Sequence, residues 1–197
     1  MNREFDNSLP KIERQISLFM LMYDEEAFHG RREVFHRGLA SNLRMLQRDM
    51  RDLTDAGLLK MKYDAKHDQY IGKTIQTEKF EINPEATGRR RQHLLRLHRL
   101  CVLLYDLEGS ESSVVEDYED SLYYYQEDLK DARIHPEEYS EDELIKPELP
   151  RLSDARDSYR HLFPECCSKT MHRDFEMLKK FGVEVKYYPR YKVYLIS

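Results

Sequence analysis

Two segments of 16 residues in this chain resemble each other, and they align without a gap at an offset of 125 residues. The copies span residues 43–58 and 168–183. The identical pairs are Arg48 and Arg173, Asp49 and Asp174, Leu53 and Leu178, and Gly57 and Gly182. Apolar residues recur at i, i+4 and i+7, which is the spacing of one buried helix face. They are Leu46, Met50 and Leu53 in the first copy and Met171, Phe175 and Leu178 in the second. The two glycines stand where a helix C-cap needs a left-handed residue.

The segment after each glycine also repeats. Residues 58–63 and 68–71 flank a short polar tip in the first copy, and residues 183–188 and 191–196 flank one in the second. Each flank alternates apolar and polar residues, so both segments are predicted to be β-hairpins. The chain therefore predicts the same helix–glycine–hairpin unit twice.

A further similarity lies upstream of each unit, at a different offset. Residues 12–24 resemble residues 94–106 at an offset of 82, with Tyr23-Asp24 on Tyr105-Asp106. The change of offset places 43 extra residues between these two anchors in the second copy. We therefore expect an insertion between the first and second helices of the second unit.

The repeated helix resembles the recognition helix of bacterial winged helix-turn-helix regulators of the DeoR-like and WYL-associated type. Their pattern runs roughly S-x-R-T-I-x-R-D-L-x-x-L-x-x-x-G. The residues that fall on its specified positions are Asn42, Arg44, Leu46, Arg48, Asp49, Met50, Leu53 and Gly57, and then Lys169, Thr170, Met171, Arg173, Asp174, Phe175, Leu178 and Gly182. The departures are Met45, Cys167 and Lys169 at the Thr, Ser and Arg positions. Cys167 is a poor N-cap, so Ser168 is the expected cap.

The resemblance covers residues 9–72, 92–106 and 151–196, and it implies binding to double-stranded DNA. The sensor domain usual in such regulators is expected to be absent. With the apolar stripe buried, the opposite face of the first helix would enter a major groove, where Arg reads guanine and Gln reads adenine. Asp49 is expected to pair with a nearby Arg or Lys. The expected DNA-binding residues are Arg44, Gln47, Arg48 and Arg51 on the helix, Lys66 and His67 at the hairpin tip, and Arg89, Arg90 and Arg91 in the linker.

The second unit offers a weaker basic surface. Its candidate DNA-binding residues are Lys169, His172 and Arg173 on the helix and Arg190 and Lys192 at the hairpin tip. Glu176 stands where the first copy has Arg51. This surface therefore has two interpretations, a second DNA contact or a surface for dimerisation or partner binding.

The net charge of the whole chain argues against nucleic-acid binding, but the distribution of charge along the chain does not. The formal net charge is −5, but residues 106–150 hold 16 acidic residues against three basic ones, a net charge of −13. The other 152 residues therefore carry +8. Two basic regions flank one acidic block, so the mean value hides a segregated pattern.

The acidic block also contains five tyrosines, and residues 120–132 are predicted to be helical before Pro136, Pro147 and Pro150 interrupt the pattern. The tyrosines are Tyr118, Tyr123, Tyr124, Tyr125 and Tyr139. Three interpretations stay open: a solvated and partly disordered excursion, a partner-binding or dimerisation surface, and a DNA-mimicking or autoinhibitory strip.

Signals of catalysis are absent from the sequence. No Gly-rich phosphate loop, GxSxG or nucleophile–base signature is present. The three cysteines, Cys101, Cys166 and Cys167, form neither a disulfide framework nor a CxxC zinc pair. We expect no catalytic site, metal or cofactor. No apolar run approaches the length of a membrane span, and the N-terminus lacks an apolar signal region.

These observations predict a mainly α (α+β) protein with two tandem winged helix-turn-helix domains. The expected boundaries are 9–75 for the first domain, 76–91 for a basic linker, and 92–197 for the second domain with its acidic insertion at 107–150. The expected function is sequence-specific binding of double-stranded DNA in transcriptional regulation, in the cytoplasm, as a homodimer. The alternative is a protein–protein interaction module whose acidic insertion docks on a basic partner or mimics DNA toward it.

Overall fold

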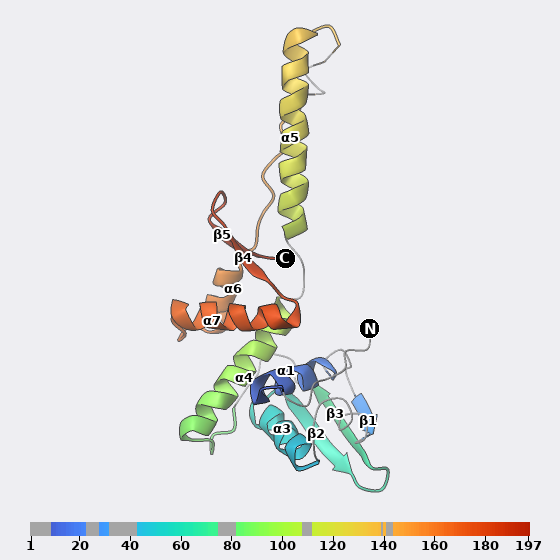
Figure 1. The fold of residues 1–197 in the computed structure, drawn as a ribbon, viewed down its shortest axis with the longest axis vertical. Helices are drawn as coiled ribbons and strands as arrows, with labels where there is room; N and C mark the ends of the chain where they lie inside the picture. Colours follow the sequence, from blue (N-terminus) through green and yellow to red (C-terminus); the bar gives the residue numbers. More distant parts are fainter. Residues whose placement is uncertain are drawn as a thin grey trace. The chain divides into compact units, whose positions relative to one another are not determined.

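The computed structural model describes residues 9–22, 28–31, 43–74, 82–107, 112–138, 140 and 144–197. These residues form a mixed α+β structure with more helix than strand and two small antiparallel sheets (Figure 1). The chain divides into two compact units, Met1–Asp106 and Leu107–Ser197. Among the described helices, none is long and apolar enough to cross a lipid bilayer.

Within the described residues, the first unit contains a three-stranded sheet and three helices. Its sheet has the order β1-β3-β2, and central β3 is antiparallel to both neighbours. Helix α3 packs on α1, α4 and β2. The apolar side of α3 is buried, with Leu46, Met50 and Leu53 at most 2% exposed. The elements are α1 (Lys11–Met20), β1 (Phe28–Arg31), α3 (Leu43–Asp55), β2 (Leu59–Asp64), β3 (Gln69–Thr74) and α4 (Gly88–Asp106).

The second unit contains a helix–hairpin arrangement preceded by one long helix. Helix α6 packs on β5, and the Tyr159 ring lies 5.5 Å from Phe163 and 5.7 Å from Phe175 between ring centroids. Met171, Phe175 and Leu178 are buried as the spacing predicts. The elements are α5 (Ser112–Ile134), α6 (Ala155–Leu162), α7 (Ser168–Leu178), the short 3-10 helix η2 (Lys179–Phe181), β4 (Val185–Tyr188) and β5 (Val193–Ile196).

The repeat predicted from the sequence is confirmed in both helices and both hairpins. Helix α3 leads into the β2–β3 hairpin, and α7 with η2 leads into the β4–β5 hairpin. Gly57 and Gly182, which end the helical segments, have φ values of 74° and 89°. The expected Ser168 cap is wrong: Ser168 is the first residue of α7, and Cys167 is an N-cap without a side-chain cap hydrogen bond.

We expect Gly182→Ala to lower the free energy of unfolding of the second unit by about 1 kcal/mol. No heavy atom lies within 4 Å of an added Cβ, so the left-handed backbone alone causes the loss. Gly182→Asn should cost less, because Asn tolerates this region better than Ala. Denaturant unfolding followed by circular dichroism measures both variants, and equal stability of Gly182→Ala and the wild type would contradict this reason.

Helix α4 belongs to a different unit from the one that the upstream similarity predicted. We expected a linker over 76–91 and the second domain from residue 92. Instead α4 begins at Gly88, packs on α1 and α3, and belongs to the first compact unit. Seven apolar residues of α4 are buried, at 94, 97, 100, 101, 102, 103 and 104. Because these positions cover more than one helix face, their spacing does not specify the neighbour. Residues 76–81 of the expected linker lie outside the described residues.

The acidic insertion is dominated by α5. Its helix contains the predicted segment 120–132 and extends it at both ends. It ends at Ile134, just before His135-Pro136, because a proline disfavours helical backbone in the residue ahead of it. Tyr139 lies outside the described residues, as do Asn42, Tyr23 and Asp24.

Candidate nucleic-acid interface

The outward face of α3 carries free cationic side chains. Arg44, Gln47, Arg48 and Arg51 are all exposed. None of these four side chains forms an ion pair or hydrogen bond with another residue in the described part of the chain. The structure therefore brings together the four helix residues predicted from the sequence, on the side opposite Leu46, Met50 and Leu53.

The acidic residues of α3 lie on the inner side of the helix. Asp49 is 1% exposed and accepts hydrogen bonds from Arg14 Nε at 2.6 Å, Arg14 Nη2 at 3.3 Å and Gln15 Nε2 at 3.0 Å. Asp52 is 6% exposed, pairs with Lys11 Nζ at 2.7 Å and accepts from Gln15 Nε2 at 3.0 Å. Asp49 was expected to pair with a cation, and this expectation is confirmed: the cation is Arg14 of α1.

Helix α4 completes this network from the other side. Arg90 Nη2 contacts Asp52 Oδ1 at 3.4 Å and also pairs with Asp55. The hydrogen bond to Asp55 raises the pKa of Arg90 above its ordinary value. Burial opposes ionisation of Asp52, but the hydrogen bonds from Lys11 and Gln15 and the positive charge of Lys11 outweigh it and lower the pKa of Asp52.

This network was not predicted from the sequence. Its one local signal is the spacing of three carboxylates at 49, 52 and 55, which share a helix face. Arg14, Lys11 and Arg90 balance those three carboxylates. As a result, the field of the outward arginines is not cancelled by acids of their own helix.

His93 belongs to the same network, and its position predicts how the free energy of unfolding depends on pH. Its Nε2 lies 2.8 Å from Gln15 Oε1 and 3.9 Å from Asp52 Oδ2. Burial and the positive charge of Lys11 lower the pKa of His93 below its ordinary value. The unfolded chain therefore binds more protons than the folded chain between the folded pKa and about pH 6.5.

It follows that His93 contributes stability above about pH 6.5, and that this contribution is lost as pH falls through the folded pKa. We expect His93→Gln to flatten the rise of the unfolding free energy across this window. Denaturation midpoints measured in half-unit steps from about pH 5 to 7.5 test this. His161→Gln, which changes an exposed histidine, is the control. A slope unchanged by His93→Gln would contradict the assignment.

The tip of the first hairpin is held by an acidic side chain. Asp64 Oδ1 accepts from the Lys66 backbone N at 3.0 Å, and Asp64 Oδ2 lies 2.6 Å from His67 Nδ1. The His67 hydrogen bond lowers the pKa of Asp64. Both Lys66 and His67 are exposed as predicted. The Lys66 ammonium forms no ion pair with a described residue, whereas one ring nitrogen of His67 is occupied.

The three arginines expected in a linker lie in the first turn of α4 instead. Arg89 and Arg91 are exposed and form no ion pair with the residues that the structure describes. Arg90 points its guanidinium at Asp52 and Asp55 and is held within the first unit. The three consecutive cations therefore have different roles, with Arg89 and Arg91 facing solvent.

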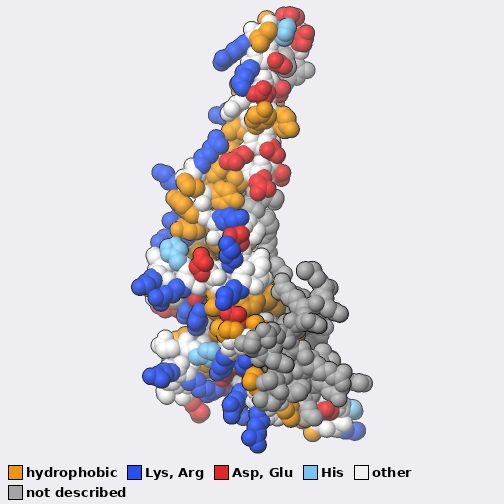
Figure 2. Space-filling model, viewed as in Figure 1, with side chains coloured by type: hydrophobic (Ala, Val, Ile, Leu, Met, Phe, Trp, Pro, Cys, Tyr) orange, Lys and Arg blue, Asp and Glu red, His pale blue; other side chains and the backbone are white. Residues whose placement is uncertain are grey.

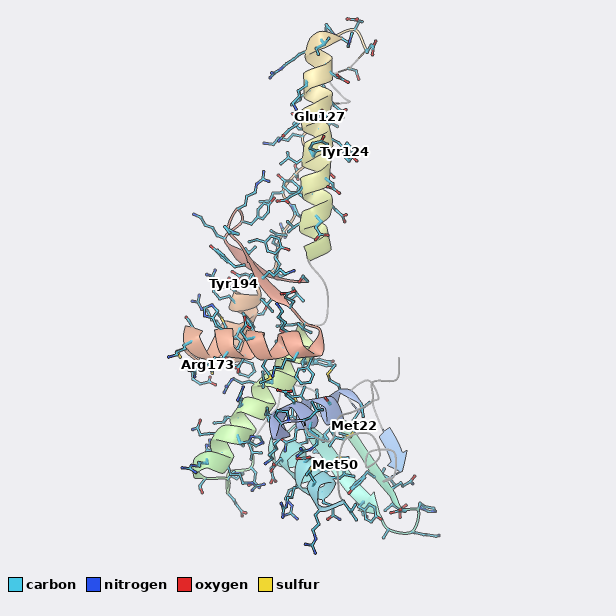
Figure 3. The ribbon with its side chains drawn as sticks, in the orientation of Figure 1. Met22, Met50, Tyr124, Glu127, Arg173 and Tyr194 are labelled. Carbon is cyan, nitrogen blue, oxygen red and sulfur yellow. The ribbon has the colours of Figure 1, made fainter. Side chains whose placement is uncertain are left out.

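Helix α7 exposes a weaker basic face than α3 does. Lys169, His172 and Arg173 are exposed, and so is Glu176. His172 Nε2 lies 3.2 Å from the Tyr194 hydroxyl of β5, and Figure 3 labels Tyr194 there and Arg173 on α7. The repeated aspartate, Asp174, is 1% exposed and accepts a hydrogen bond from the Tyr159 hydroxyl at 2.8 Å. The buried carboxylate recurs, but its donor is a phenol instead of a guanidinium.

The tip of the second hairpin contacts the acidic helix. Arg190 Nη1 lies 3.4 Å from Glu119 Oε1, and the Tyr191 hydroxyl donates to the same oxygen at 3.1 Å. Burial and this hydrogen bond raise the pKa of Tyr191. Lys192, also predicted as a DNA-binding residue, is exposed. Glu119 was not predicted from the sequence, because 71 residues separate it from Arg190.

One group in the described residues has the spacing of metal ligands. His135, Glu137 and Glu138 follow α5, and their ligand atoms lie within 4.8 Å of one another. All three side chains are exposed, as is common for acidic groups that bind no ion. This group supports no metal centre by itself.

Comparison with known proteins adds no family. The chain matches no protein-family model, and the searches of curated proteins and of solved structures found no match.

Proposed function

We propose that this chain binds double-stranded DNA sequence-specifically in transcriptional control, through two tandem winged helix-turn-helix units. The order of the described elements in the first unit, which is helix, strand, helix and hairpin with β3 central in the sheet, supports this fold. The recurrence of helix, left-handed glycine and hairpin in the second unit supports its repetition. In this proposal α3 is the recognition helix and the β2–β3 hairpin is the wing.

The observation that carries the proposal is the division of charge across α3. Three arginines and Gln47 face solvent without described partners, while Asp49 and Asp52 are buried against cations of other helices. A helix with this outer face suits a major groove, where arginine donates two hydrogen bonds to guanine and glutamine pairs with adenine. Lys66 and the exposed Arg89 and Arg91 would add phosphate contacts, which position the protein without reading sequence.

The second unit is proposed to contribute less to DNA binding. Glu176 replaces the cation at position 51, and Arg190 is paired with Glu119. Lys169, Arg173 and Lys192 remain exposed. Two units in one chain, or a homodimer of such chains, would then cover two half-sites with unequal affinity.

A second candidate function rests on α5. Tyr123 and Tyr124 are 59% and 66% exposed, and their ring centroids are 5.7 Å apart. Acidic side chains line one edge of this helix (Figure 2). Exposed aromatic rings among carboxylates suit a cationic protein partner, so the alternative is a protein-interaction module on a winged-helix scaffold.

A salt-dependent DNA titration tests the proposal. Fluorescence anisotropy would compare a labelled duplex from around the protein's own gene with a scrambled duplex. We expect tighter binding to the first duplex and a linear fall of log K with log salt, with a slope of about −0.9 for each phosphate contacted. Absence of binding to both duplexes at about 50 mM salt would exclude DNA binding and favour the protein-interaction module.

A further inference from the structure

Within the second unit, one carboxylate holds two residues at the hairpin tip. Glu119 Oε1 accepts a hydrogen bond from the Tyr191 hydroxyl at 3.1 Å and lies 3.4 Å from Arg190 Nη1. One residue earlier on α5, the Tyr118 ring meets the Tyr191 ring edge-on, with centroids 6.3 Å apart. The Arg190 guanidinium also lies 5.7 Å from the centre of the Tyr191 ring. The tip is therefore bound to α5 by an ion pair, a hydrogen bond and a ring contact.

The helix that makes these contacts is strongly acidic. Residues 112–134 hold seven acidic and two basic residues, a net charge of −5. Tyr124 and Glu127 lie one turn apart on this helix (Figure 3). Carboxylate and phosphate oxygens accept the same hydrogen bonds from a guanidinium. A row of carboxylates on a helix therefore offers a cationic hairpin tip the same chemistry as a nucleic-acid backbone.

We propose that α5 is an intramolecular competitor of DNA phosphate, and that the contact of Glu119 with Arg190 and Tyr191 must open before the second hairpin can bind DNA. This inference rests on the proposed function. The contact is partly exposed, since the side chains of Arg190 and Glu119 are 60% and 46% accessible. Exposed ion pairs and ring contacts are each weak, so the helix reduces DNA affinity by about three- to tenfold and does not abolish binding.

The test compares two variants that remove one negative charge from the same turn of α5. Glu119→Gln weakens the contact with the tip. Asp120→Asn is the matched control, because Asp120 is exposed and forms no ion pair or hydrogen bond with a described residue. Duplex DNA affinity of the full chain is measured for both by anisotropy. Hydrogen exchange of the tip is measured without DNA, where the Tyr191 and Lys192 amides bond to the Tyr188 carbonyl at 3.2 and 2.8 Å.

We expect Glu119→Gln to bind DNA about three- to tenfold more tightly than Asp120→Asn, and to exchange faster at the tip. Adding Arg190→Gln to Glu119→Gln should remove the gain, because the released cation is the group that contacts phosphate. Equal affinities of the Glu119 and Asp120 variants, with wild-type binding intact, would overturn the inference alone. Faster exchange without tighter binding would also overturn it. Failure of every variant and of the wild type to bind DNA would overturn the proposed function as well.

Discussion

Replacing Arg14 with leucine is expected to lower the free energy of unfolding of the first unit by about 3 kcal/mol or more. The guanidinium of Arg14 is the cation bonded to Asp49, and both residues are buried, at 9% and 1% exposure. Its removal leaves a buried carboxylate whose remaining side-chain donor among the described residues is the Gln15 amide. Hydrogen exchange of peptides covering α3 measures the loss, because it reports on this unit separately from the second.

Two further variants separate the buried pair from general charge effects. Lys11→Met removes a cation from the same network, but the Lys11 side chain is 52% exposed, so its loss should cost less than about 1 kcal/mol. Arg14→Leu/Asp49→Leu removes both charges and should recover part of the stability lost in Arg14→Leu. Equal unfolding free energies for Arg14→Leu and Lys11→Met would contradict the conclusion that the buried Arg14–Asp49 pair stabilises α3.

Reversing two charges on α3 is expected to weaken duplex DNA binding by about a hundredfold or more. Arg44→Glu/Arg48→Glu removes two donors, each worth about 1–3 kcal/mol at a base edge, and adds repulsion toward phosphate. Both residues are exposed and without described partners, so the fold should tolerate the change. Anisotropy titrations measure affinity, and the thermal unfolding midpoint verifies that the variant is folded.

The equivalent reversal in the second unit is the matched comparison. Lys169→Glu/Arg173→Glu changes the same two helix positions at the offset of 125. We expect a smaller loss, because Glu176 and the paired Arg190 already weaken that surface. Equal losses would mean that both units bind DNA as a two-site clamp. A loss confined to the second variant would exchange the roles of α3 and α7.

The parts of the fold predicted from the sequence are those set by short-range spacing. The i, i+4, i+7 pattern predicted the buried face of each repeated helix, and Leu53 and Leu178 are both 0% exposed. Each glycine predicted the left-handed end of its helical segment, and alternation predicted the hairpins. These features depend on residues close in sequence, so one amino-acid sequence is enough to predict them.

The parts that were missed depend on residues far apart in sequence. Arg14 and Asp49 are 35 residues apart, and Arg190 and Glu119 are 71 residues apart. Arg90 was expected to contact DNA, but its partners on α3 were not recognisable from a run of three arginines. The position of α4 was also missed, because a helix with apolar residues on several faces can pack against either neighbouring unit.

In the proposed function α3 lies in the major groove, and a methylation footprint of the bound DNA measures this placement. Dimethyl sulfate modifies guanine N7 in the major groove and adenine N3 in the minor groove, so it distinguishes the two. We expect protection of guanine N7 over a few adjacent base pairs in the wild-type complex, and loss of this protection with Arg44→Glu/Arg48→Glu. Protection of adenine N3 alone, or unprotected guanines at saturating protein, would contradict it.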